Sequence, residues 1–304
     1  MLRIRNLNKS FHHAPILRGL DLELERGEIL AVLGPSGSGK STFLRIIAGL
    51  ERPSSCEIFE CRGTVSMMFQ NYALFPHLNV EQNILFALHD CPKKERQARL
   101  RHLLERFAIQ NISLKKIDQI SGGQAQRVAF ARAMARGCEL LLLDEPFSNL
   151  DQNLKGVLRA ELKDLIKAQN IAAILVTHDI NDAYSIADKI ALLDRGKILA
   201  LASPENLYLH LGDKNAARLI PDLNIIDQEL DLSDAFFAWI AAQNYIFAYT
   251  QLQVGSAFEA RVVAKEFLGA FYKLRLEYRS VIFHIYTPSS HPVGEKISLD
   301  FVNL

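Results

Sequence analysis

Apolar residues in the first two-thirds of the chain form short continuous runs separated by more polar segments. Three runs, at residues 29–33, 140–143 and 172–176, have the length and composition of strands that are buried on both faces of a parallel sheet. Residues 41–49 and 93–107 lie between such runs and have helical character. This alternation predicts an α/β fold in which helices cover a mostly parallel sheet.

The last third of the chain has a different pattern. Residues 219–224 contain Pro221 and are expected to connect two domains, and Ser233 is the expected cap of a short apolar helix around residues 236–240. Beyond it, apolar and polar residues alternate over 272–279 and 297–301, which predicts half-buried strands of a small antiparallel module. We therefore expect two domains, 1–218 and 225–304.

Charge and composition exclude several classes of protein. The 304 residues include 35 Lys+Arg and 34 Asp+Glu, a net charge of +1, so no overall basic field favours nucleic acid as a partner. No apolar run approaches the ~18 residues of a membrane span, and the first ten residues lack a signal-peptide pattern. Four cysteines without a C-x-x-C pair indicate reduced thiols. The chain is expected to stay in the cytosol.

Candidate chemistry begins in the glycine-rich segment 34–41, GPSGSGKS, which matches G-x-x-x-x-G-K-[ST] between an apolar strand and a helix. Glycines let backbone N–H groups surround phosphate oxygens. Lys40 is expected on the β- and γ-phosphates, and Ser41 offers a hydroxyl to Mg²⁺. The expected nucleotide contacts are Gly34, Pro35, Ser36, Gly37, Ser38, Gly39, Lys40, Ser41 and Thr42.

An acidic pair follows the apolar run at 140–143. Asp144 and Glu145 would lie at the carboxyl edge of a buried strand, where parallel sheets bind ligands. Asp144 is expected to hold Mg²⁺ through water, and Glu145 to polarise an attacking water. The alternative is an ordinary solvated turn, which the nearby phosphate loop disfavours.

The segment 121–124, Ser-Gly-Gly-Gln, narrows the class of protein. It has the spacing of a capping box before a helix at 126–136, and its two glycines would also expose that helix N-terminus to a phosphate. Taken alone, it predicts only a well-capped helix. Between a phosphate loop and an acidic strand, it resembles the signature of ABC-transporter ATPases.

The resemblance extends over residues 2–212 and implies further roles. Phe11 corresponds to the aromatic residue that stacks on adenine, with a core phenylalanine as the alternative. Gln70 resembles the Q-loop glutamine, which senses Mg²⁺ and water, and the segment 75–78 resembles importer members. Segment 148–151 resembles the D-loop, and His178 the switch histidine at the γ-phosphate. The stretch from 52 to 70 is shorter than in most importer ATPases, and Cys56 replaces a usual glycine.

The resemblance implies the ATPase subunit of an importer, in which two copies close around ATP. The implied catalytic residues are Glu145, His178 and Gln70, with Mg²⁺ held by Ser41, Gln70 and Asp144. The contacts made in trans, to the ATP of the other copy, would come from Ser121, Gly122, Gly123, Gln124 and Asp151. Implied partners are integral membrane permease subunits and, indirectly, a solute-binding protein, at the cytoplasmic side of the inner membrane.

The cargo is harder to infer, because it is not expected to touch this chain. The overall likeness favours iron(III) import, with sulfate, molybdate, thiamine, polyamines and sugars as alternatives. A soluble ABC ATPase acting on DNA or ribosomes is less favoured, since the chain has one phosphate loop and no zinc or heptad insertion.

Two segments remain outside these motifs. The C-terminal module resembles the small OB-like accessory domain (TOBE) of importer ATPases, although the family's V-R-P-E segment is not recognisable at 248–251. The strongest basic run is expected to form a solvated helix face rather than a phosphate or lipid patch; it comprises Lys93, Lys94, Arg96, Arg99 and Arg101.

Overall fold

The computed structural model describes residues 1–302 except 149, 222, 229, 232 and 244–245. The chain divides into two compact units, Met1–Pro204 and Glu205–Leu304. The first unit is shorter than the expected domain 1–218, because α8 (Lys214–Ala217) belongs to the second unit. Ion pairs from Lys214 and Arg218 to Asp227, at 3.5 and 3.0 Å, attach this helix to the residues that follow it.

A six-stranded sheet forms the centre of the first unit, as the apolar runs predict. Five of its strands are parallel and one antiparallel strand completes the edge. The strands from the three apolar runs are wholly buried, whereas the first strand of the sheet is mostly half-buried. In sheet order the strands are β5 (Val65–Met68), β6 (Leu140–Asp144), β7 (Ala172–Thr177), β3 (Ile29–Leu33), β8 (Lys189–Asp194) and β9 (Lys197–Ala202).

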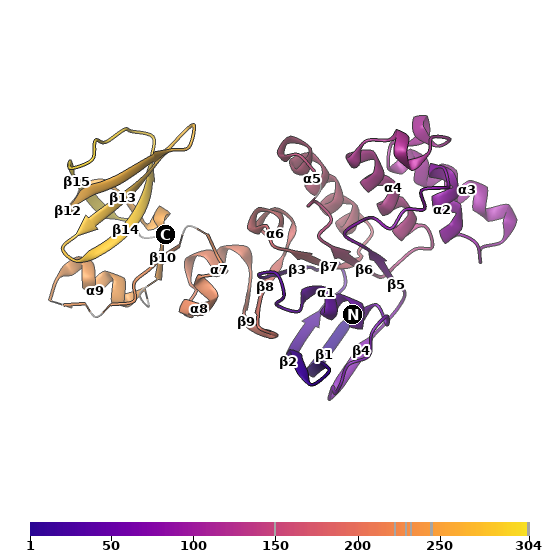
Figure 1. The fold of residues 1–304 in the computed structure, drawn as a ribbon, viewed down its shortest axis with the longest axis horizontal. Coiled ribbons are helices and arrows are strands. Elements are labelled where there is room, and N and C mark those ends of the chain that lie inside the picture. The colour runs from indigo at the N-terminus through magenta and orange to yellow at the C-terminus, as the bar shows by residue number, and fades with distance from the viewer. Residues whose placement is uncertain (149, 222, 229, 232, 244–245, 303–304) are drawn as a thin grey trace. The chain divides into compact units, whose positions relative to one another are not determined.

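Helices lie on both sides of this sheet and at one end of it (Figure 1). Helix α1 begins at Lys40, directly after the phosphate loop, and it ends at Ile47 rather than at the expected Gly49. The helix expected at 126–136 begins earlier, at Gly122. The helices of this unit are α1 (Lys40–Ile47), α2 (Val80–Ala87), α3 (Lys93–Arg106), α4 (Gly122–Met134), α5 (Gln152–Ala168) and α6 (Ile180–Ile186), with short 3-10 turns at Gln110–Ile112 and Ile117–Gln119.

A smaller antiparallel sheet packs against α1. It consists of β1 (Leu2–Phe11), β2 (Ala14–Leu24) and the short β4 (Ile58–Cys61). Its inner leucines join Phe43 and the strands of the central sheet in one buried apolar cluster. The four-residue β4 agrees with the short stretch between residues 52 and 70.

The second unit contains a four-stranded antiparallel sheet, which confirms the alternating pattern: Leu274 and Leu276 are buried, whereas Arg275 between them is exposed. β14 and β15 form its two edges, so the described pairings make an open sheet. Its elements are α7 (Pro204–Leu209, whose first residue falls in the first unit), α8, β10 (Leu223–Ile225), α9 (Ala235–Ala242), β11 (Ile246–Ala248), a 3-10 turn (Tyr249–Gln251), β12 (Leu252–Phe267), β13 (Tyr272–Tyr278), β14 (Val281–Thr287) and β15 (Lys296–Phe301).

Helix α9 begins as expected near residue 235, but the expected cap is wrong. Asp234, not Ser233, accepts hydrogen bonds from the backbone N–H groups of Phe236 and Phe237, at 2.9 and 3.2 Å. The Ser233 hydroxyl instead donates to Asp231 at 2.7 Å. Aspartate and serine are both preferred N-cap residues. Here the Asp234 carboxylate accepts from the first backbone N–H groups of α9, and the Ser233 hydroxyl does not.

Candidate active site

The loop between β3 and α1 has a backbone that requires glycine at particular positions. Gly37 and Gly39 have φ angles of 81° and 108°, a region that glycine adopts without strain. A Cβ atom on Gly34 would lie 2.1 Å from the carbonyl oxygen of Leu193. The structure therefore forms the tight strand-to-helix loop that the motif predicts.

Lys40 follows this loop as the first residue of α1 and is almost fully buried. Its ammonium donates hydrogen bonds to the carbonyl oxygens of Gly34 and Pro35, at 2.8 and 2.9 Å. Burial lowers the pKa of Lys40, and the carboxylates of Glu145 and Asp144 oppose this effect. A partly desolvated cation at the mouth of the loop would attract phosphate more strongly than one in water.

Two oxygen ligands for a hard cation meet beside the loop. The Ser41 hydroxyl donates to a carboxylate oxygen of Asp144 at 3.1 Å. Burial raises the pKa of Asp144, whereas the hydrogen bond from Ser41 lowers it. The described residues contain no group of three or more His, Cys, Asp or Glu side chains placed to hold a metal. This donor set fits Mg²⁺, which protein sites hold with one or two carboxylates while phosphates and waters complete the shell.

Glu145 stands at the centre of the site. The amide of Gln70, which follows β5, donates to one of its carboxylate oxygens at 3.2 Å. The Nδ1 atom of His178, which follows β7, lies 3.2 Å from the other oxygen. The structure thus brings together the three expected catalytic residues, each from the carboxyl end of a neighbouring strand.

The backbone of Glu145 is also unusual. Its φ angle is 46°, in the left-handed region that non-glycine residues rarely adopt. Its N–H donates to the carbonyl of Val176 at 2.9 Å, which ties this conformation to β7. Such local strain is typical of functional positions.

A buried network that the sequence did not predict supports the His178 segment. Thr177 donates to Asp182 at 3.0 Å and accepts from the N–H of Asp179 at 3.0 Å. Arg159, on α5, donates from Nε to the same Asp182 at 2.7 Å. No local spacing marks this network, because its members come from different elements.

Asn83 and Arg132 hold the loop that follows Gln70. Asn83, fully buried on α2, accepts from the N–H of Phe75 at 2.8 Å and donates to the carbonyl of Asn79 at 3.0 Å. Arg132, on α4, donates to the carbonyl of Tyr72 at 2.7 Å. The one signal for these roles in the sequence was that Asn83 lies next to apolar residues of α2.

Ser121 is the N-cap of α4, and the predicted capping box is confirmed. Its hydroxyl accepts from the N–H of Gln124 at 3.3 Å, and the Gln124 side chain accepts from the N–H of Ser121 at 3.1 Å. A Cβ atom on Gly123 would lie 2.5 Å from Leu154, so α4 approaches α5 closely here. Asp151 caps α5 by accepting from Leu154 N–H at 2.9 Å. Asn149, in the D-loop segment, lies outside the described residues.

Comparisons with known proteins agree with this geometry. A family model described as "ABC transporter" matches residues 17–148. The chain is 37% identical over 242 residues to the Fe(3+) ions import ATP-binding protein FbpC 1 of Haemophilus influenzae, which covers 76% of this chain and 74% of that protein. This chain belongs to the ABC transporter family.

Other members of the ABC transporter family are similarly related. The chain is 39% identical over 239 residues to the putrescine transport ATP-binding protein PotG of Escherichia coli, covering 75% of this chain but only 63% of that protein. A solved dimer of the ATP-binding cassette MJ0796 bound to ADP and Pi matches 67% of this chain and 99% of its own, with 28% identity and a TM-score of 0.60. The chain cbiO1 of Clostridium perfringens matches 68% of this chain and 90% of its own, with 26% identity and a TM-score of 0.63.

Phe11 lies at the end of β1 in this ABC transporter chain and is 40% exposed. The Lys9 ammonium sits 4.5 Å from the centroid of its ring, a cation–π distance. Its exposure disfavours the alternative of a core phenylalanine, and stacking on adenine stays a prediction.

Backbone hydrogen bonds connect the β1–β2 hairpin to the phosphate loop. The N–H of Arg18 donates to the carbonyl of Gly196 at 2.8 Å, and the N–H of Gly196 donates to the carbonyl of Ser38 at 3.1 Å. A Cβ atom on Gly196 would lie 2.2 Å from the carbonyl of Ile16. Only glycine therefore fits between the hairpin and the loop.

A groove of about 400 Å³ begins near the segment that follows Gln70. Phe75 and Phe86 line it with their rings 4.6 Å apart, and Arg132 borders it. Phe86 is 55% exposed, more than the other phenylalanines of the first unit. In the part of the chain that the structure describes, no helix has the length and apolar character to cross a bilayer.

Proposed function

We propose that this chain binds ATP with Mg²⁺ and hydrolyses it as the ATPase subunit of an importer. The observation that carries the proposal is the contact of Gln70 and His178 with the Glu145 carboxylate beside Lys40 and the Ser41–Asp144 pair. Few other activities require a phosphate loop, a cation site and a positioned base together.

Each residue has a role in this proposal. Lys40 and the loop N–H groups bind the phosphates, and Glu145 accepts a proton from the attacking water. His178 contacts the γ-phosphate while the buried Asp182 network keeps its segment in place. Ser41, Asp144 and Gln70 would hold Mg²⁺, which neutralises developing charge on the phosphate oxygens when it is bound.

Two copies would complete each site. Ser121, Gly122, Gly123 and Gln124 would contact the γ-phosphate bound to the other copy, together with Asp151 of the same surface. The closeness of the α4 and α5 N-termini, shown by Gly123 against Leu154, supports this shared surface. The dimeric state of the similar cassette MJ0796 also supports it.

Closure of the pair would then act on separate membrane subunits. The groove with Phe75 and Phe86 is the proposed contact for a permease. Arg132 borders this groove and donates a hydrogen bond to the loop after Gln70, so it links the groove to that loop. In this proposal the chain acts at the cytoplasmic side of the inner membrane, and a solute-binding protein would deliver cargo to the permease from the far side.

Iron(III) is the proposed cargo, and a polyamine is the second candidate. Relatives named for Fe(3+) import are 36–37% identical to this chain, and those named for putrescine or spermidine/putrescine reach 39–40%. Deletion of the gene should lower uptake of radiolabelled iron(III) and leave putrescine uptake intact. The reverse result would replace iron with a polyamine.

Purified chain should release phosphate from ATP only with Mg²⁺, and Lys40→Ala should abolish nucleotide binding. A control with Lys163→Ala, a lysine on α5 outside the site, should behave as the unmodified chain does. Co-purification with a membrane protein supports the importer. Co-purification with RNA instead would favour the soluble alternative.

A further inference from the structure

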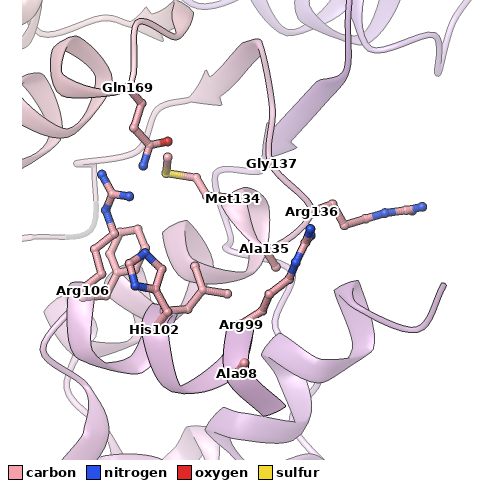
Figure 2. A pocket seen from close by; sticks show the side chains of 11 residues that line it. Ala98, Arg99, His102, Arg106, Met134, Ala135, Arg136, Gly137 and Gln169 are labelled. Carbon is pink, nitrogen blue, oxygen red and sulfur yellow. The ribbon is translucent and has the colours of Figure 1, made fainter. Parts of the chain in front are cut away.

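A second cavity lies in the first unit, outside the site described above. It has a volume of about 440 Å³ and opens between α3, the C-terminal end of α4 and the residue that follows α5. Four basic side chains border it: Arg99, His102 and Arg106 from α3, and Arg136 after α4 (Figure 2). No carboxylate from the described residues lines it.

The floor of this cavity is apolar. Leu103, Phe107 and Met134 line it, and each is less than a tenth exposed. A cavity with a cationic rim and an apolar floor suits an anion that has an organic body better than it suits bare phosphate or water.

Among the described residues, two of the arginines have no acidic partner. Arg136 pairs with Asp90 at 2.7 Å, whereas Arg99 donates a hydrogen bond to the Sγ atom of Cys91 at 3.8 Å. Arg106 lies against the side-chain amide of Gln169, whose oxygen accepts from the guanidinium when the amide is turned by 180° from the orientation drawn in Figure 2. Neither Arg99 nor Arg106 forms an ion pair within the described part of the chain, so no carboxylate there neutralises either charge.

The basic side chains lie at two opposite ends of the cavity. Arg106 and His102 project into one end of the cavity, and Arg99 extends toward Arg136 at the other (Figure 2). Arg99 and Arg106 are seven residues apart on one helix, which corresponds to about 10 Å along its axis. A ligand that reaches both must carry two separated anionic groups.

Helix dipoles explain only some of the basic residues around the cavity. α3, α4 and α5 all end near the cavity, and each C-terminus carries about half a negative charge. This accounts for Arg106 in the last turn of α3 and for Arg136 just beyond α4. Arg99 lies two turns before the end of α3, beyond the range over which the dipole acts.

We propose that this cavity binds a small, soluble organic anion with two phosphate or carboxylate groups, of the class of sugar bisphosphates. The site is additional to the ATP site, because none of its lining residues belongs to the phosphate loop or to the residues around Glu145. Its ligand would therefore bind whether or not ATP is present.

Methionine methyl groups offer a local test on the full chain. Of the four methionines, Met134 alone lines the cavity, and Met67 and Met68 lie on β5. With ¹³C-methyl methionine, titration of fructose 1,6-bisphosphate should shift the Met134 resonance to saturation, with Met67 and Met68 as internal references. Saturating ATP should leave the Met134 titration unchanged.

Matched variants test the charge requirement. Arg99→Gln and Arg106→Gln should each weaken binding about 2- to 5-fold, the effect of losing one exposed ion pair. Arg101→Gln removes the same charge from an exposed position on α3 outside the cavity and should leave binding unchanged. An unshifted Met134, an equal effect of Arg101→Gln, or binding only to phosphatidylserine vesicles would each overturn the proposal.

Discussion

Among single residues, Glu145 is held through both its side chain and its backbone. Gln70 and His178 contact its two carboxylate oxygens, and its backbone lies in the left-handed region, with φ 46°. A carboxylate held this way stays in one orientation toward a water molecule, which is the requirement for a general base.

Glu145→Gln should slow ATP hydrolysis at least 100-fold and leave ATP binding nearly unchanged. The amide keeps the size of the side chain but lacks the basic oxygen that accepts a proton, a contribution of about 10²–10⁴ in rate. Phosphate release and equilibrium binding of ATP, measured on the same preparation, check this. Turnover near the rate of the unmodified chain would exclude Glu145 as the base.

Asp144 should give ATP binding a pH dependence. Because burial raises the pKa of Asp144 above the usual 3.8, the carboxyl takes up a proton at a higher pH than an ordinary aspartate. The free chain then gains stability as the pH falls through that raised pKa, whereas Mg²⁺-dependent ATP binding weakens over the same range.

Asp144→Asn should therefore leave the free chain at least as stable and remove the stabilisation that Mg²⁺-ATP provides. Thermal unfolding with and without Mg²⁺-ATP, at several pH values, measures both effects. Asp118→Asn, at an exposed position, is the matched control. Full Mg²⁺-ATP stabilisation of the Asp144 variant would show that this carboxylate does not support the metal.

At the scale of single elements, Ser121 at the N-terminus of α4 has two roles. It caps the helix, and in the proposed dimer it binds a phosphate. Its oxygen accepts from the N–H of Gln124 within the chain, while the hydroxyl hydrogen remains able to donate to a phosphate oxygen. Capping and phosphate binding are thus compatible in one side chain, and they can be separated by substitution.

Ser121→Asp should preserve the helix and block ATP-driven dimerisation. Aspartate caps helices about as well as serine, so the free energy of unfolding should change by less than about 0.5 kcal/mol. Its carboxylate would repel the γ-phosphate of the other copy. Ser121→Ala should instead cost about 1 kcal/mol of stability.

Sedimentation with ATP in a Glu145→Gln background, together with thermal unfolding, distinguishes the two variants. If the Asp variant dimerises normally, Ser121 is only a helix cap.

How far the sequence predicts an element depends on how local its determinants are. The phosphate loop and the capping box at Ser121 depend on residues within eight positions, and both were correctly predicted. The cap of α9 was wrong because Ser233 and Asp234 are both good caps, and the backbone decides between them. The link from Arg159 to Asp182 joins two helices, so no spacing along the chain reveals it.

At the scale of the whole molecule, the two compact units divide after Pro204, before the connector that the sequence predicts. Pro221 is a reasonable local signal for a connector, but α8 and most of α7 already fall in the second unit. Contacts across the expected linker, rather than its composition, decide where the first unit ends.

Mixing two variants that carry different substitutions tests the proposed assembly. Ser121→Arg and Lys40→Ala should each be inactive alone, because each damages both composite sites of a homodimer. In the mixed dimer, one site carries both lesions and the other carries neither, so ATP hydrolysis should partly return. Phosphate release at equal concentrations of the two variants is the measurement. A mixture as inactive as its components would argue against shared sites.

The glycine at position 196 also has a thermodynamic consequence for nucleotide recognition. Its backbone makes hydrogen bonds both to Arg18, in the hairpin whose first strand ends at Phe11, and to the carbonyl of Ser38, so main-chain hydrogen bonds link the proposed adenine platform to the phosphate cradle. Adenosine and tripolyphosphate should each bind weakly alone. In ATP the two parts are covalently linked, so binding of one part should hold the other near its own site at a high effective concentration and raise the affinity. Little ordering cost should then remain for binding.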